Sequence, residues 1–154
     1  MFDIIKAWFG FRKEPDNLAV DRDGVAVNPE VCIAVVRVLR EITCSDSDVA
    51  HLEAKAISDI VRSHFLVDEN QMIAFLTKAA EEVRANLPIN AVYALLNRTY
   101  CERQKVLLLA ACWRIVLADG QIERAEKKLA TQLRYRFQLS EDQEAEAIRI
   151  AEEG

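Results

Sequence analysis

Glycine, proline and histidine are scarce in this chain. Its 154 residues include four glycines, three prolines and two histidines, too few turn-forming residues for the many tight turns of an all-β fold. Neither His51 nor His64 has the H-E-x-x-H spacing of a zinc hydrolase, and we expect His64 to be a cation near the C-terminal end of a helix. The chain has no P-loop, dinucleotide fingerprint or G-x-S-x-G elbow, so the sequence predicts a protein that is not an enzyme.

Clustered positive charge and paired cysteines are also missing. The formal net charge is −5, which argues against nucleic acid as a partner, because phosphate contacts need clustered Lys and Arg. None of the four cysteines forms a C-x-x-C pair, so we expect reduced thiols in a cytoplasmic protein.

The most apolar stretch, 106–118, contains Arg114 and is shorter than the ~20 residues needed to span a bilayer. The N-terminal segment has no signal-peptide cleavage site.

Apolar residues make up 51% of the chain, enough to fill one core. Their spacing is helical, and residues 102–118 are apolar almost all round, which predicts a central buried helix. The fold class is therefore all-α, a single-domain bundle of about seven helices. The expected helices cover about 28–44, 48–64, 68–87, 91–96, 99–118, 121–137 and the residues from 140 onward.

Local signals sharpen several helix ends and one turn. Asp23-Gly24, between two short apolar runs, indicates a small hairpin. In a capping box, the side chain of the residue before a helix accepts a hydrogen bond from the backbone N–H of the third helical residue. The side chain of that third residue accepts one from the backbone N–H of the residue before the helix. Such boxes are predicted for Asp68 with Gln71, Thr99 with Glu102, and Ser140 with Gln143.

Residues 1–28 form an amphipathic segment and linker ahead of the helical domain at 29–154. Bulky apolar side chains share one helical face near the start, and Arg12 and Lys13 follow them. This face either packs on the protein's own core or on a second subunit of a homodimer, or it binds a protein partner or the inner membrane peripherally. The candidate contact residues are Phe2, Ile5, Trp8 and Phe9.

The chain contains an internal repeat. Adding 73 to the apolar stripe of the helix at 48–64 gives the stripe of the helix at 121–137, and the same shift maps Asp46 onto Asp119 and Glu53 onto Glu126. A helix, an acidic turn and a second helix therefore recur. Two such helical hairpins would bury their apolar faces on one another about a pseudo-twofold axis.

The repeated acidic turns are the candidate functional site. They share the pattern D-[GS]-x-[IV]-x-x-x-E, which matches only the closing half of a calcium-binding EF-hand loop. Their acids could be purely structural, because carboxylates stabilise the start of a helix. Glu53 and Glu126 nevertheless lie ~55° from the centre of their apolar stripes, so each needs a partner.

Two kinds of partner fit these inward glutamates. Arginines such as Arg37, Arg40 or Arg114 could form salt bridges with them. Alternatively, a Ca²⁺, Mg²⁺ or Mn²⁺ ion could be shared between the two turns, and none of these cations would be essential for folding. The metal candidates are Asp46, Glu53, Asp119 and Glu126, with Asp48 and Glu123 as outer members.

The second turn and its surroundings resemble a known family. Residues 117–122, Glu126 and Leu139-Ser140-Glu141 are similar to the TerB-like tellurite-resistance family, over roughly Pro29 to Glu152. The resemblance implies an all-α fold related to the N-terminal domain of the co-chaperone DjlA, with metal binding by the acids and a role in bacterial stress responses. In the first turn Ser47 replaces the glycine, so the resemblance does not imply equal metal affinity in both halves.

These observations give two main functional hypotheses, with a carboxylate-based hydrolase as a remote third. The first is a cytoplasmic TerB-like binding or scaffold domain that binds a divalent cation weakly through its duplicated acidic turns. The alternative is an adaptor that binds a protein or a membrane through the N-terminal aromatic face, with acidic turns that are purely structural.

Overall fold

The structure is a computed structural model that describes residues 15–43, 50–118 and 124–153. These residues form a helical bundle, and the predicted all-α fold is confirmed. Within the described ranges the only strand-like feature is an antiparallel bridge between Val20 and Ala26. The helices are α2 (Pro29–Thr43), α3 (Ala50–His64), α4 (Glu69–Arg84), α5 (Ile89–Thr99), α6 (Glu102–Ala118), α7 (Arg124–Arg136) and α8 (Glu141–Glu153).

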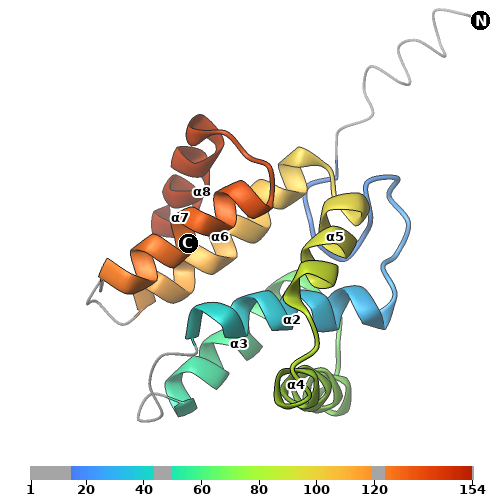
Figure 1. Ribbon diagram of the computed structural model, residues 1–154. Helices are drawn as coiled ribbons and strands as arrows, with labels where there is room; N and C mark the ends of the chain where they lie inside the picture. The colour runs from blue at the N-terminus through green and yellow to red at the C-terminus, as the bar shows by residue number, and fades with distance from the viewer. Residues whose placement is uncertain (1–14, 44–49, 119–123, 154) are drawn as a thin grey trace, which may run out of the picture.

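Helices α2 and α6 occupy the centre of the bundle and contact each other (Figure 1). Helices α4 and α5 pack on α2, whereas α7 and α8 pack on α6, so the two central helices organise the others around them. The prediction that 102–118 is the central buried helix is confirmed, because Leu108, Leu109 and Cys112 have no exposed surface. No helix of the described part is both long enough and apolar enough to cross a membrane.

Burial of apolar side chains on α2 and α6 drives this arrangement. Val36, Val38 and Leu39 of α2 are fully buried and belong to the same core as the apolar side chains of α6. Full burial of one Val or Leu side chain contributes roughly 1.5–3 kcal/mol. Neither central helix could bury its apolar surface in an isolated hairpin, and the contact between them therefore completes the fold.

Two of the three predicted capping boxes are confirmed. The Asp68 carboxylate accepts from the Gln71 backbone at 2.8 Å, and the Gln71 side chain accepts from the Asp68 backbone at 2.9 Å. Ser140 and Gln143 form the same reciprocal pair of bonds at the start of α8.

The third predicted box, formed by Thr99 with Glu102, is wrong. Helix α5 continues to Thr99, whose hydroxyl donates to the Leu95 carbonyl at 2.6 Å within that helix. The start of α6 is instead held by Gln104, whose side-chain oxygen accepts from the Cys101 backbone at 3.0 Å. The error arises because α5 is longer than the apolar pattern indicated.

Residues 15–28, called the strap below, lead into α2 and contain the predicted hairpin. The Asp21 backbone N–H donates to the Val25 carbonyl at 2.7 Å, and the Val27 N–H donates to Ala19 at 3.0 Å. Gly24 has φ +82°, a conformation that L side chains rarely adopt, which explains glycine at this turn. The small hairpin is therefore confirmed.

Two fully buried side chains fasten the strap to the helices. Gln104 donates from Nε2 to the Asn17 carbonyl at 2.9 Å and to the Val20 carbonyl at 2.8 Å. The Tyr100 hydroxyl donates to the Leu18 carbonyl at 2.7 Å. The Leu18 side chain is itself fully buried in the core. The strap is therefore part of the same hydrogen-bonded and packed structure as α5 and α6.

The two predicted repeats have the same helix order and the same main contacts. Helix α2 contacts α3 and α4, as α6 contacts α7 and α8. Helix α5 joins the halves and has no counterpart among the described helices. This correspondence agrees with the 73-residue shift of the sequence, whereas a common origin and a pseudo-twofold axis stay predictions.

We expect Gln104→Leu to lower the free energy of unfolding by about 2–3 kcal/mol, because it leaves two partly buried strap carbonyls and one backbone N–H without their Gln104 partner. Urea denaturation followed by circular dichroism measures this change. Gln132→Leu, at an exposed position of α7, is the matched control and should stay within about 0.5 kcal/mol of the wild type. Equal stability of the two variants would contradict this role of Gln104.

Candidate functional site

The predicted metal residues fall largely outside the part of the chain that the structure describes. Asp46, Asp48, Asp119 and Glu123 lie in the undescribed ranges 44–49 and 119–123. Of the other two candidates, Glu53 lies in the first turn of α3 and Glu126 lies near the start of α7. The predicted contact residues of the N-terminal segment, Phe2, Ile5, Trp8 and Phe9, also lie outside the described residues.

The helices that carry Glu53 and Glu126 each contact the opposite half of the bundle. Helix α3 packs against α6, and α7 packs against α2. In the view of Figure 1, the C-terminal ends of α2 and α6 and the N-terminal ends of α3 and α7 lie on the left-hand side of the molecule. The helix ends that border the two acidic turns therefore face the same side in this view.

Arg37, one of the predicted partners of the inward glutamates, has another partner. Its Nη1 lies 3.2 Å from Oε1 of Glu82 on α4, and its Nη2 donates to the Leu87 carbonyl at 3.1 Å. The Arg37 side chain is only 4% exposed. A charge buried this deeply needs its carboxylate, so α4 and not an acidic turn neutralises Arg37.

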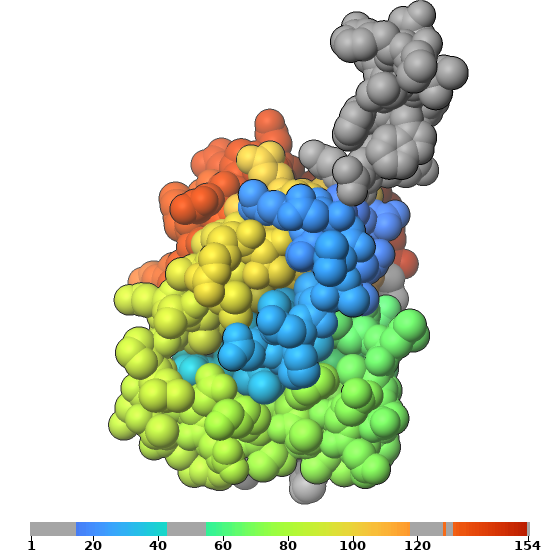
Figure 2. Space-filling view, turned by 90° about the vertical axis from the view of Figure 1, so that its right-hand side faces the viewer, coloured from blue at the N-terminus to red at the C-terminus, as the bar shows by residue number. Residues whose placement is uncertain are grey.

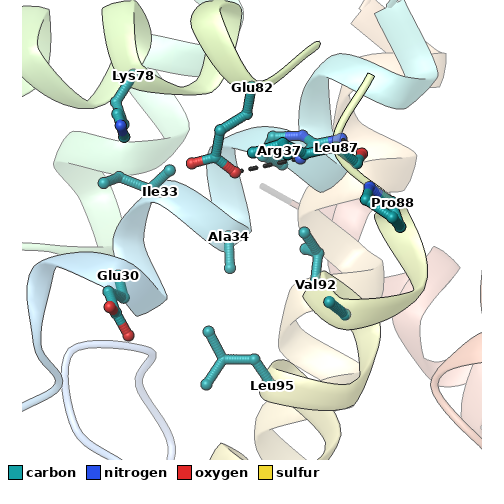
Figure 3. A pocket seen from close by; sticks show the side chains of 11 residues that line it. Glu30, Ile33, Ala34, Arg37, Lys78, Glu82, Leu87, Pro88, Val92 and Leu95 are labelled. Carbon is teal, nitrogen blue, oxygen red and sulfur yellow. Dashed lines mark hydrogen bonds and ion pairs between the residues drawn. The ribbon is translucent and has the colours of Figure 1, made fainter. Parts of the chain in front are cut away.

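The Arg37–Glu82 pair lies in a groove of about 410 Å³ between α2, α4 and α5. Figure 3 shows its lining, with Lys78 and Glu30 on one side and the apolar residues of α5 on the other. This volume falls within the range of small ligand sites. The lining residues are Glu30, Ile33, Ala34, Arg37, Lys78, Glu82, Leu87, Pro88, Ala91, Val92 and Leu95.

A second nearly buried ion pair joins α7 to α8. Arg134 Nε lies 2.7 Å from Oε2 of Glu144, and the two side chains are 10% and 15% exposed. Both residues line a smaller cavity of about 280 Å³. The pair provides a charged contact between α7 and α8.

His64 does not match the prediction of a cation near a helix end. Burial lowers the pKa of His64, and the nearby positive charge of Arg114 lowers this pKa further. Within the described residues its Nε2 atom is buried and has no hydrogen-bond partner. His64 is therefore neutral at neutral pH, and the prediction is wrong because the C-terminal end of α3 packs against α6.

The described cysteines are free thiols, as the sequence predicts. Burial raises the pKa of Cys32 to about 11 and moves the pKa of Cys112 further above its usual value. Both thiols are consequently protonated at neutral pH, and the thiolate is the form that binds metal or attacks an electrophile. Within residues 15–43, 50–118 and 124–153, no group of three or more His, Cys, Asp or Glu is placed to hold a metal ion.

Comparison with protein families settles the assignment of the helical domain. The family model described as tellurite resistance protein TerB matches residues 32–151. The chain belongs to the TerB family. The match covers nearly all of α2 and extends into α8, which confirms the resemblance seen in the acidic turn. No curated protein and no solved structure matches the TerB chain.

Sequence reasoning missed the groove of this TerB domain. Its walls come from three helices separated along the chain, and their relative placement depends on the tertiary fold. One signal was available, because Arg37 interrupts an almost continuous apolar run in α2. A lone cation in such a run indicates a buried ion pair, and a carboxylate on a neighbouring helix is its expected partner.

The lowered pKa of His64 predicts a loss of stability in acid. Below about pH 6.5 the unfolded chain binds a proton at this histidine that the folded state does not yet bind, so acidification favours unfolding. We expect the free energy of unfolding of the wild type to fall relative to that of His64→Gln as the pH decreases from about 8 to 5. Urea titrations at several pH values measure this difference. Parallel pH curves for the two proteins would contradict it.

Proposed function

We propose that this TerB-family chain is a non-enzymatic binding module of a bacterial stress response, and that it holds a divalent cation weakly between its two acidic turns. The observation that carries the proposal is the pair of cross-contacts between halves, α3 with α6 and α7 with α2. These contacts favour a position for the two acidic turns at one end of the bundle. Acidic turns at opposite ends of the bundle could form two independent cation sites but not one shared site.

The donor set favours a hard cation. The proposed ligands Asp46, Glu53, Asp119 and Glu126 supply carboxylate oxygens from both halves, the donor type preferred by Ca²⁺, Mg²⁺ and Mn²⁺. Asp48 and Glu123 could complete the coordination from outside. A cation at this position would offset the mutual repulsion of the carboxylates, and its binding would therefore stabilise the folded state.

A non-enzymatic role is supported by the character of the described side chains. The buried thiols of Cys32 and Cys112 and the phenols of Tyr93 and Tyr100 all have raised pKa values, to about 12 for Tyr93. Such groups stay protonated at neutral pH and are poor nucleophiles. We therefore propose that the domain acts by binding, in the cytoplasm, with a protein as its partner.

The alternative function is that of an adaptor that binds through Phe2, Ile5, Trp8 and Phe9. It is favoured by the fixed strap, because hydrogen bonds from Tyr100 and Gln104 hold residues 17–20 next to α5 and α6. The N-terminal segment would then extend from a defined point on the domain and could reach a protein, a second copy or the inner membrane. In this alternative the acidic turns are structural.

Titration of the metal-free protein with Ca²⁺, Mg²⁺ and Mn²⁺ tests the cation site. At a free concentration ~100 times its dissociation constant, a cation bound only by the folded state adds about 2.7 kcal/mol and raises Tm by roughly 5 to 10 °C. The double variants Asp46→Asn with Glu53→Gln and Asp119→Asn with Glu126→Gln should each abolish this rise, because both halves contribute ligands.

The matched control is Glu141→Gln with Asp142→Asn, two exposed acids in the first turn of α8. It removes the same charge as the site variants and should keep the full rise in Tm. A flat response of the wild type would contradict cation binding and favour the adaptor. A rise that survives either site variant would place the cation elsewhere.

A further inference from the structure

The groove between α2, α4 and α5 has an apolar floor. Ile33 and Ala34 of α2 and Leu95 of α5 line it, and Leu87 at its edge is 48% exposed. Leu87 is one of five large apolar side chains that are exposed among the described residues. A groove of about 410 Å³ can take a few bulky side chains.

The charges along the groove restrict what can fill it. Arg37 and Glu82 neutralise each other, and the groove also has one further cation, Lys78, and one further anion, Glu30. Both lie on the same side in Figure 3, and within the described parts of the chain neither forms an ion pair. A matching occupant therefore has one acidic and one basic group along one edge of an apolar face. A purely anionic or purely cationic ligand would leave either Glu30 or Lys78 without a partner.

We propose that the N-terminal segment, residues 1–13 of the same chain, docks in this groove. Its sequence combines an apolar face of Phe2, Ile5 and Phe9 with Asp3 and Lys6. At helical spacing both charges fall on one flank of that face. Docking pairs Asp3 with Lys78 and Lys6 with Glu30, and it covers the apolar floor with the aromatic side chains.

The chain can make this contact within one molecule. The strap passes the C-terminal end of α5, where Arg22 Nη2 donates to the carbonyls of Asn97 at 3.1 Å and Tyr100 at 2.9 Å, and α5 is one wall of the groove. Figure 2 shows the strap, α5 and α4 on one face of the molecule. With residues 2–9 at helical spacing, residues 10–14 still supply up to ~17 Å of extended chain between the docked face and the strap, about the length of the 11-residue α5.

Docking covers the side chains that the adaptor alternative would use. The groove is then a resting site, and release of the segment exposes Phe2, Trp8 and Phe9 to a partner. The inference does not depend on cation binding, because none of the groove residues belongs to the acidic turns. Failure of the cation titration would leave it unchanged.

The fluorescence of Trp8 tests the inference. The chain has one other tryptophan, Trp113, which is 3% exposed, and the Trp8→Phe variant supplies its separate spectrum for subtraction. We expect Trp8 in the wild type to have a blue-shifted emission and a several-fold lower acrylamide quenching constant than in Lys78→Glu with Glu30→Lys. Reversal of both ion pairs weakens docking by about tenfold.

A charge swap on both partners identifies the occupant. Asp3→Lys with Lys6→Glu, added to the reversed groove, should restore the blue shift and the protection of Trp8. The matched control Lys128→Glu with Glu152→Lys, at exposed positions of α7 and α8, should leave Trp8 protected. Circular dichroism of each variant verifies that the helices are intact.

Three outcomes overturn the proposal. The first is a Trp8 that is quenched equally in the wild type and in the reversed groove. The second is protection that disappears on dilution together with a dimer in sedimentation, since the segment then binds a second copy. The third is protection that requires added anionic vesicles, which makes a membrane the occupant.

Discussion

The contact between α2 and α6 is the constraint on which the rest of the structure depends. Each helix is too apolar to be exposed, and each buries part of its surface against the other. In the same bundle α3 lies against α6 and α7 lies against α2. The core contacts therefore also fix the helix ends that border the acidic turns of the TerB domain, which links stability to the proposed function.

Buried polar groups complete what this apolar contact begins. Gln104 and Tyr100 satisfy the carbonyls of the strap, and Glu82 neutralises Arg37 beneath α4. Because an unpaired buried polar group costs about 1–3 kcal/mol, these bonds select one position for the strap and one for α4. The same bonds hold both partners of the proposed docking contact in place, because the strap leads to the N-terminal segment and α4 forms a wall of the groove.

Features with local causes could be predicted from the sequence, and features with tertiary causes could not. Helix ends set by neighbouring residues were correct, as for Asp68 with Gln71. Thr99 was misjudged because the length of α5 depends on packing, and His64 was misjudged because its burial comes from α6. The groove requires three helices that are distant in sequence. The acidic turns were recognised from their repeat and their family pattern, and their joint role stays a prediction.

The most direct test of a shared cation is paramagnetic broadening by Mn²⁺ in the NMR spectrum of the metal-free protein. A bound Mn²⁺ broadens the signals of nearby backbone amides. If one ion lies between the two acidic turns, substoichiometric Mn²⁺ should broaden the amides in the first turns of α3 and α7 in parallel, and Asp119→Asn with Glu126→Gln should abolish both effects. Broadening confined to one of these helices would contradict the account.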